Sequence, residues 1–165
     1  MNEAAFETPW GWLQIAASEK GITAIRFGTV AGDTPSIARP IVENQRAAAL
    51  IVDARGQVLE YFAGFRRDFS FPVDLSEGTT FQRKVWQAII RIPYGRVRSY
   101  RWVAARVGGT QYARAVGMAL GANPVPLAVP CHRVIAHDGS LGGFSCGLPL
   151  KRRLLKLEGT LDQLG

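Results

Sequence analysis

Hydrophobic and polar residues alternate in three short stretches near the N-terminus, which predicts three β-strands. The strands are expected at residues 4–7, 12–17 and 22–27. Because only a few residues separate one stretch from the next, we expect the strands to form an antiparallel meander. Residues 28–40 contain two glycines and two prolines and are expected to form a loop.

Apolar residues then recur at helical spacing over residues 43–63, which predicts a helix with a candidate break at Gly56. Residues 69–73 are expected to form a closing strand. The sequence Ser-Glu-Gly-Thr at 76–79 is the best candidate for a linker. We therefore expect two domains, at residues 1–77 and 78–165.

Beyond this linker the apolar spacing is helical, and three helices are predicted. Side chains that can cap a helix precede each one: Thr79 (with Gln82, a capping box), Ser99 and Thr110. The helices are expected to end at Pro93, Val107 and Leu120. Gly108 and Gly109 join the last two, a pattern typical of a helix-turn-helix.

Residues 125–146 have a β-like pattern, and Asp138-Gly139 is a typical hairpin turn. A last helix is expected to begin near Pro149 and to end at Gly159. Helices followed by a hairpin and another helix are typical of a winged helix-turn-helix. The predicted fold class is thus α+β, with a small antiparallel sheet plus helix in the first domain and a winged helix-turn-helix in the second.

Composition narrows the class of protein. The chain has 165 residues, of which 47% are hydrophobic and 20% charged, so it can bury a core. No apolar run approaches the roughly 20 residues of a membrane-spanning helix, and no signal peptide is visible. Two cysteines cannot make a disulfide scaffold, and two histidines leave little for a zinc site. We expect a cytoplasmic protein that binds no membrane.

The net charge of +7 is unevenly distributed. Residues 1–77 hold seven basic and ten acidic residues, a net charge of −3, whereas residues 78–165 hold thirteen basic and three acidic residues, a net charge of +10. A basic excess confined to one domain indicates a polyanion-binding domain beside a near-neutral one. A solvated basic surface is the alternative.

Cys131 is the candidate nucleophile, because His132 and Arg133 adjoin it in the basic domain. Positive charge lowers the pKa of a thiol, and the thiolate is the nucleophile. Adjacent side chains in an extended segment point apart, so His132 needs a turn or a bridging water to act as a base on Cys131. The alternative is a cysteine that serves only as a small buried hydrophobic residue.

Pro130-Cys131-His132-Arg133 resembles the active-site motif of the O6-alkylguanine-DNA alkyltransferases, the methylated-DNA–protein-cysteine methyltransferases. The resemblance covers residues 78–159 strongly, and the N-terminal part matches in length and in strand–helix order, which implies a ribonuclease-H-like first domain. Further matching blocks are Phe81-Gln82, Val85-Trp86, Ile92-Pro93-Tyr94-Gly95, Ser99-Tyr100, Ala113-Arg114-Ala115-Val116-Gly117, Asn123-Pro124 and Leu157-Glu158-Gly159.

The resemblance implies a role for each matching catalytic residue. Cys131 would take the alkyl group of O6-methylguanine, and of O4-methylthymine, in one in-line displacement that is never reversed. His132 would accept the thiol proton through a water, and Glu158 would orient its imidazole ring. Tyr100 would donate to the leaving guanine ring, and Asn123 would hold the turn before the active-site segment.

The resemblance also implies substrate contacts. The carbonyls of Cys131 and Val134 would accept from the exocyclic amine of guanine, and Ser145 would lie near the alkylated oxygen. Phe144, which replaces a tyrosine of some members, and Pro126 would contact the base or a bulky adduct. Trp102 is placed with the substrate-binding residues, and packing between helices is its alternative.

For DNA, the resemblance implies that the third helix docks in the minor groove and that Arg114 fills the gap left by the flipped base. Extruding a base from the duplex costs roughly a few kcal/mol, and the cost is lower for a poorly paired base. The basic domain would supply phosphate contacts. The other residues placed at this surface are Thr110, Gln111, Tyr112, Ala113, Gly117 and Arg133.

The expected partner is double-stranded DNA that carries O6-alkylguanine. We expect the protein to need no metal and no cofactor, and to be a monomer that can cluster on DNA. Cys146 departs from the family pattern, which implies a small residue at that position, and it is expected either to narrow the pocket or to be a second thiol near the substrate. Two other functions are open. One is a lesion sensor that binds the flipped base without alkyl transfer, and the other is a winged-helix regulator with a structural Cys131.

Overall fold

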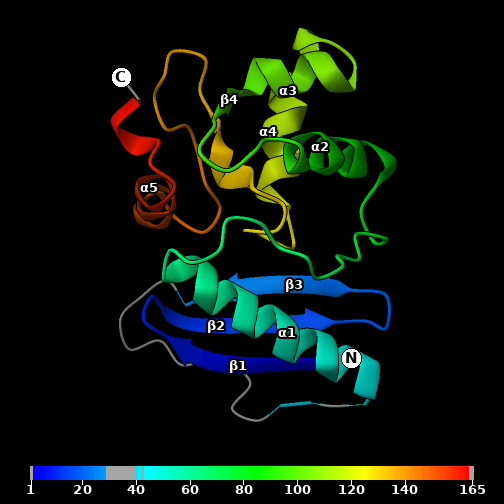
Figure 1. Cartoon of the computed structure of the whole chain (residues 1–165). Helices are drawn as coiled ribbons and strands as arrows, with labels where there is room; N and C mark the ends of the chain where they lie inside the picture. The colour runs from blue at the N-terminus through cyan, green and yellow to red at the C-terminus, as the bar shows by residue number, and fades with distance from the viewer. Residues whose placement is uncertain (1, 29–39, 42, 164–165) are drawn as a thin grey trace. The chain divides into compact units, whose positions relative to one another are not determined.

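The computed structural model describes residues 2–28, 40–41 and 43–163. The chain divides into two compact units, Met1–Ser76 and Glu77–Gly165 (Figure 1). Most of the loop predicted at residues 28–40 lies outside the described residues.

The sheet of the first unit is a three-stranded antiparallel meander, as predicted. Its strands β1 (Asn2–Thr8), β2 (Gly11–Ala17) and β3 (Ile22–Phe27) lie in the order β1-β2-β3. Alternation along β2 buries Leu13 and Ile15, and Ile15 pairs with the buried Ile25 of β3.

Helix α1 (Gln45–Phe62) lies across this sheet (Figure 1) and contacts all three strands. Residues at helical spacing, among them Ala47, Ala54 and Val58, form its buried face. The helix continues through Gly56, so the candidate break there is wrong. A single exposed glycine costs a helix only about 1 kcal/mol, which the buried face outweighs.

The closing strand predicted at residues 69–73 is also wrong. Only Val73 forms a bridge to β3, opposite Ile22, whose N–H donates to the Pro72 carbonyl at 2.9 Å. Proline has no N–H to give to a ladder, which disfavours a longer strand. The Phe69 ring packs against that of Tyr61, with the ring centroids 5.3 Å apart.

The second unit begins with helix α2 (Thr80–Ile90), and the predicted capping box is present. The Thr79 N–H donates to Gln82 Oε1 at 2.9 Å, and the Gln82 N–H donates to Thr79 Oγ1 at 3.1 Å. Trp86 lies in the core and donates its indole N–H to the carbonyl of Ala119 at 2.9 Å, which ties α2 to helix α4.

The predicted helix-turn-helix consists of α3 (Tyr100–Val107) and α4 (Ala113–Gly121). Ser99 caps α3, as predicted, by accepting from the Trp102 N–H at 3.0 Å. The third helix begins later than expected and without a cap from Thr110, because the chain first forms a 3₁₀ turn, η1 (Thr110–Tyr112). The preceding Gly108 and Gly109 have φ angles of 154° and 143°, which favour glycine.

Residues 125–146 do not form the predicted hairpin. They contain the 3₁₀ turn η2 (Cys131–Arg133) and the short strand β5 (Val134–Ile135), which pairs in parallel with β4 (Arg98–Ser99). The Asp138-Gly139 turn is present, since the Gly139 N–H donates to the Ala136 carbonyl at 3.0 Å. No return strand forms within the described residues, and the carbonyls of Val134 and Leu141 accept from the Lys151 side chain instead.

The last elements are helix α5 (Leu148–Leu157), which buries Leu154 and Leu155, and the 3₁₀ turn η3 (Leu161–Gln163). The predicted α+β class is confirmed, with a loop in place of the hairpin wing. None of the helices described is long and apolar enough to cross a membrane.

Candidate active site

Cys131 begins the 3₁₀ turn η2 and is buried, with 5% of its surface exposed. Its N–H donates to the Val129 carbonyl at 2.8 Å, so the backbone is fixed at the candidate nucleophile. The turn replaces the extended geometry in which adjacent side chains point apart. His132 and Arg133 belong to the same turn, and both side chains are buried.

Cys131 lines a pocket of about 160 Å³. The other lining residues come from α3, α4 and the segment before α5, and they are Tyr100, Gly117, Leu120, Gly121, Gly143, Phe144 and Ser145. The structure therefore brings together five residues that the sequence analysis placed at the substrate or the DNA: Cys131, Tyr100, Phe144, Ser145 and Gly117.

Tyr100 is held against the segment that precedes α5. Its hydroxyl accepts from the Gly143 N–H at 3.2 Å and lies 3.5 Å from the Gly143 carbonyl. Burial raises the pKa of Tyr100, so the phenol keeps its proton at neutral pH and remains a donor. Gly142 has a φ of +70°, and a Cβ there would lie 2.8 Å from the Tyr100 hydroxyl. The segment approaches Tyr100 this closely only with glycine at position 142.

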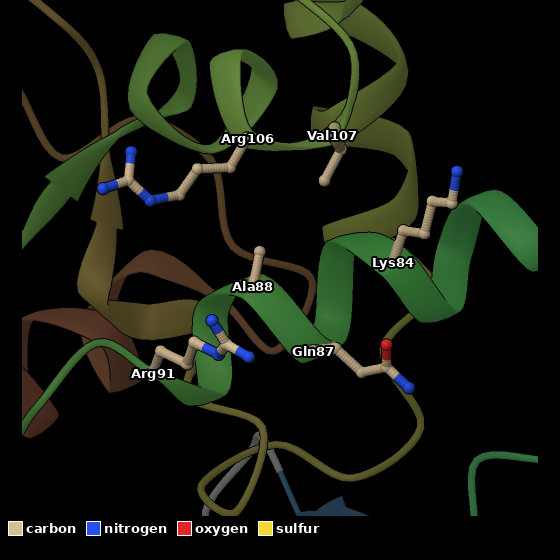
Figure 2. A pocket seen from close by; sticks show the side chains of 6 residues that line it. All are labelled: Lys84, Gln87, Ala88, Arg91, Arg106 and Val107. Carbon is tan, nitrogen blue, oxygen red and sulfur yellow. The ribbon is translucent and has the colours of Figure 1, made fainter.

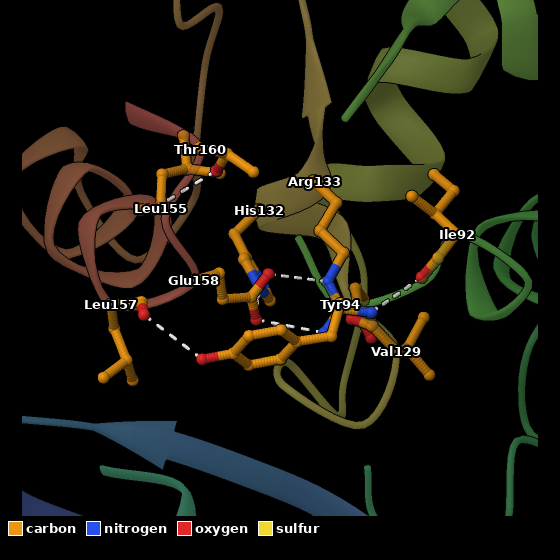
Figure 3. A network of polar contacts seen from close by, with 10 residues as sticks. Ile92, Tyr94, Val129, His132, Arg133, Leu155, Leu157, Glu158 and Thr160 are labelled. Carbon is orange, nitrogen blue, oxygen red and sulfur yellow. Dashed lines mark hydrogen bonds and ion pairs between the residues drawn. The ribbon is translucent and has the colours of Figure 1, made fainter. Parts of the chain in front are cut away.

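A buried carboxylate holds the imidazole of His132. His132 Nε2 lies 2.9 Å from Oε2 of Glu158, the residue that follows the last turn of α5 (Figure 3). Burial lowers the pKa of His132, in spite of the opposing effect of Glu158. The imidazole is therefore neutral, and the carboxylate fixes the tautomer that carries its proton on Nε2.

Arg133 completes this network, and its buried side chain does not share the exposed surface of the other residues that were predicted to bind DNA. Its Nε and Nη2 donate to Glu158 at 2.8 and 3.0 Å, and its Nη1 donates to the carbonyl of Ile92 at 2.7 Å (Figure 3). Burial favours the neutral form of Glu158, but His132 and Arg133 outweigh burial and lower the pKa of the carboxyl to about 2. Only 7% of the Arg133 side chain is exposed, so little of it is accessible to a phosphate in solution.

The Cys131 thiol is protonated at rest. Burial raises its pKa to about 11, and a hydrogen bond with Asn123 reverses only part of this effect. The prediction that His132 and Arg133 lower the thiol pKa is wrong, because the imidazole is neutral and Glu158 neutralises the guanidinium. A base must therefore remove the proton before the sulfur can act as a nucleophile.

Asn123 spans the turn between α4 and η2. Its Nδ2 donates to the Val129 carbonyl at 2.8 Å, and its Oδ1 accepts from the Val125 N–H at 3.0 Å. The side chain thus holds the segment that leads to Cys131, in the manner that the resemblance implied.

Lys151 is a residue of this site that the sequence analysis did not single out. Its side chain is fully buried, and Nζ donates to the carbonyls of Val134 at 2.7 Å, Leu141 at 2.5 Å and Gly143 at 3.0 Å. Burial lowers its pKa to about 8. The signal is its spacing, since Lys151 precedes Leu154 and Leu155 by three and four residues and so shares their buried face.

Three predicted substrate residues, Pro126, Trp102 and Val134, are not among those that line the pocket. Pro126 is buried in the turn before Cys131, where it forms a bridge with Val129. Trp102 lies under the guanidinium of Arg106, which is 3.6 Å from the ring centroid. Both residues belong to α3, so this contact does not test the alternative of packing between helices. The Val134 carbonyl already accepts from Lys151.

The predicted DNA-binding residues other than Arg133 lie on η1 and α4. Arg114, Thr110, Gln111 and Tyr112 are exposed, and Ala113 and Gly117 are half-buried. The opposite face of α4 buries Val116, Ala119 and Leu120 in the core. Since Gly117 also lines the pocket, this surface adjoins the candidate nucleophile.

Within residues 2–28, 40–41 and 43–163, no group of three His, Cys, Asp or Glu side chains could hold a metal ion.

Family models match both parts of the chain. The model described as 6-O-methylguanine DNA methyltransferase, ribonuclease-like domain, matches residues 1–75. The model described as 6-O-methylguanine DNA methyltransferase, DNA binding domain, matches residues 80–160. The matched segments together cover most of the chain.

Known proteins resemble it over nearly their full length. A methylated-DNA–protein-cysteine methyltransferase of Methanosarcina acetivorans is 41% identical over 163 residues, which are 97% of this chain and 99% of the relative. The constitutive methylated-DNA–protein-cysteine methyltransferase of Bacillus subtilis is 41% identical over 155 residues, or 92% of each protein. The crystal structure of Mycobacterium tuberculosis OGT in complex with DNA matches with a TM-score of 0.81 and 36% identity, and covers 96% of this chain and 93% of that one. These likenesses confirm the resemblance and the fold class.

Proposed function

The chain belongs to the 6-O-methylguanine DNA methyltransferase family, and from this premise we propose that it repairs DNA by moving the alkyl group of O6-methylguanine to Cys131. The transfer forms a thioether that the chain cannot cleave, so each molecule acts once. O4-methylthymine presents the same methyl–oxygen bond on a smaller ring and is the second proposed substrate.

One observation carries the proposal. Cys131 lines a pocket next to a buried His132–Glu158 pair, with His132 Nε2 2.9 Å from the carboxylate. A thiol with a pKa of about 11 needs a base, and a neutral imidazole with a fixed tautomer supplies one. His132 accepts the thiol proton through a bridging water, and Glu158 stabilises the imidazolium that forms.

The sulfur of Cys131 forms a bond to the methyl carbon while the bond from that carbon to O6 breaks. The electron pair passes into the guanine ring, where Tyr100 donates a proton or a hydrogen bond to the leaving base. A phenol whose pKa is raised by burial keeps its proton for this step.

The base must leave the duplex, because a thiol buried in a pocket cannot reach an atom inside the base stack. The surface of η1 and α4 adjoins the pocket through Gly117, and its small residues allow close approach to DNA. We place the exposed Arg114 in the gap left by the extruded base. Replacing Arg114 with Ala should therefore slow repair of duplex DNA far more than transfer from free O6-benzylguanine, and equal losses would exclude this role.

The decisive experiment is intact-mass analysis of the chain after incubation with an O6-methylguanine duplex, followed by peptide mapping. The expected result is one added methyl group per chain, on Cys131 and not on Cys146. The matched variants are Cys131→Ser, which should take no methyl group, and Cys146→Ser, which should take one. Repeated turnover would contradict the proposal that each molecule acts once. Binding to the lesion without methyl transfer would favour the alternative function of a lesion sensor.

A further inference from the structure

A groove of about 390 Å³ lies between helices α2 and α3 (Figure 2). Its lining residues are Lys84, Gln87, Ala88, Arg91, Arg106 and Val107. None of them lines the pocket of Cys131. The groove is therefore a second concave feature of this unit, and the proposed chemistry makes no use of it.

Its charge is strongly positive and is not balanced locally. Lys84 lies on α2 and Arg91 directly follows that helix, with Gln87 and Ala88 between them, and Arg106 of α3 lines the same groove (Figure 2). The sequence contains no Asp or Glu between Glu77 and Asp138, so α2, α3 and α4 carry no carboxylate. Like charges gathered without a counter-charge repel one another, so the binding of an anion in this groove would be favourable.

Arg106 is held in place for such a role. Its guanidinium carbon lies 3.6 Å from the centroid of the Trp102 ring. An arginine stacked in this way loses less freedom when it binds and keeps its N–H edge for an anion. The contact also gives Trp102 a function outside the pocket.

We propose that this groove binds the phosphodiester backbone of DNA at phosphates separate from those beside the flipped base. The three cations are exposed, which suits a polyanion that remains partly hydrated better than a small anion that needs enclosure. Seven helical residues span about 10 Å, a length over which one DNA strand carries about three phosphates. The amide of Gln87 adds a neutral donor within this stripe. The proposal rests on the proposed function, which makes DNA the partner.

The test compares two double variants that remove the same charges. Lys84→Gln with Arg91→Gln changes the groove, and Arg152→Gln with Lys156→Gln changes exposed residues of α5. The affinity for an undamaged duplex is measured by fluorescence anisotropy over a series of salt concentrations, and thermal melting verifies that each variant is folded. The groove variant should bind the duplex about three- to tenfold more weakly. The slope of log affinity against log salt concentration should become less steep by about 1.8, because each neutralised phosphate contributes about 0.9 to that slope. The α5 variant should keep the slope of the unmodified chain.

Equal changes of affinity and salt slope in both double variants would mean that only the net charge matters, and would overturn the proposal. An unchanged salt slope in the groove variant would also overturn it. A second measurement uses duplexes that carry one neutral methylphosphonate each. At one to three positions, the methylphosphonate should weaken DNA binding by the unmodified chain but not by the groove variant. Equal effects on both proteins at every position would overturn the proposal. Methyl transfer to the unmodified chain tests the proposed function independently. The groove can prove not to bind phosphates while methyl transfer still occurs, and it can bind phosphates in a chain that transfers no methyl group.

Discussion

His132 Nε2 lies 2.9 Å from Glu158 Oε2, and neither side chain has more than 1% of its surface exposed. The same carboxylate accepts two hydrogen bonds from Arg133. One buried anion therefore orients the proposed base and neutralises a buried cation, so its removal should affect both chemistry and folding.

Glu158→Gln should lower the free energy of unfolding by about 3–5 kcal/mol, because it leaves the Arg133 cation buried without a counter-charge. Urea unfolding measures the loss. The matched control is Glu60→Gln, which breaks the exposed ion pair with Arg66 at 3.2 Å and should cost at most about 1 kcal/mol. A similar small loss for both variants would show that burial does not strengthen the Glu158 pair.

The same carboxyl predicts an acid-sensitive stability. Its pKa is about 2 in the folded chain and 4.5 ordinarily, so between these values the unfolded chain binds more protons. The stabilisation is complete above pH 4.5 and is lost as the pH falls towards 2, by about 3 kcal/mol in total. Glu158→Gln should flatten this part of the pH profile of unfolding, and an unchanged slope would contradict the assignment.

His132→Gln should slow alkyl transfer by about 100-fold or more, because the thiol loses its base. Since the thiol pKa is about 11, the rate of the variant should keep rising with pH into the alkaline range. Single-turnover rates from free O6-benzylguanine measure this. His137→Gln, a change at the other histidine, which is exposed, should match the unmodified chain. A variant of His132 with full activity at neutral pH would exclude general-base catalysis.

Lys151→Met should destabilise the chain by about 1–3 kcal/mol, because three carbonyls lose their shared donor. Alkyl transfer should also slow, since the hydrogen bonds from Lys151 hold Val134 and the pocket residue Gly143 in place. Arg152→Met, at the exposed neighbouring position, should change stability by less than about 0.5 kcal/mol. Equal stability of the two variants, measured by urea unfolding, would mean that the buried lysine does not hold this segment.

Gly142→Ala should reduce transfer by about tenfold or more, since its φ of +70° is strained for alanine and the new Cβ would meet the Tyr100 hydroxyl. Gly56→Ala on the exposed face of α1 is the control, because a Cβ there meets nothing within 4 Å and Gly56 does not line the pocket, and its loss should stay within about threefold. Comparable rates for the two variants would show that the position of Tyr100 tolerates movement of this segment.

Local signals in the sequence predicted what local chemistry determines. The capping box of Thr79 and Gln82, the Ser99 cap and the meander each depend on residues close together in the chain, and all three are confirmed. Thr110 failed as a cap because a 3₁₀ turn competes with the first turn of α4.

The missed features depend on contacts distant in sequence. Arg133 and Lys151 look like solvated cations until Glu158 and a set of carbonyls, 8 to 25 residues away, are brought to them by folding. Burial also reverses the expected pKa of Cys131, and burial is a property of the whole unit. The motif thus located the site, whereas its protonation states followed only from the structure.

The hydrogen bond from Arg133 to the Ile92 carbonyl joins the end of α2 to the Glu158 network. A substitution at Glu158 or Arg133 would thus change how much intact protein a cell retains as well as how fast each molecule reacts. Survival after alkylation damage would combine the two effects. Only rates normalised to the number of folded molecules would tell a slow repair protein from a scarce one.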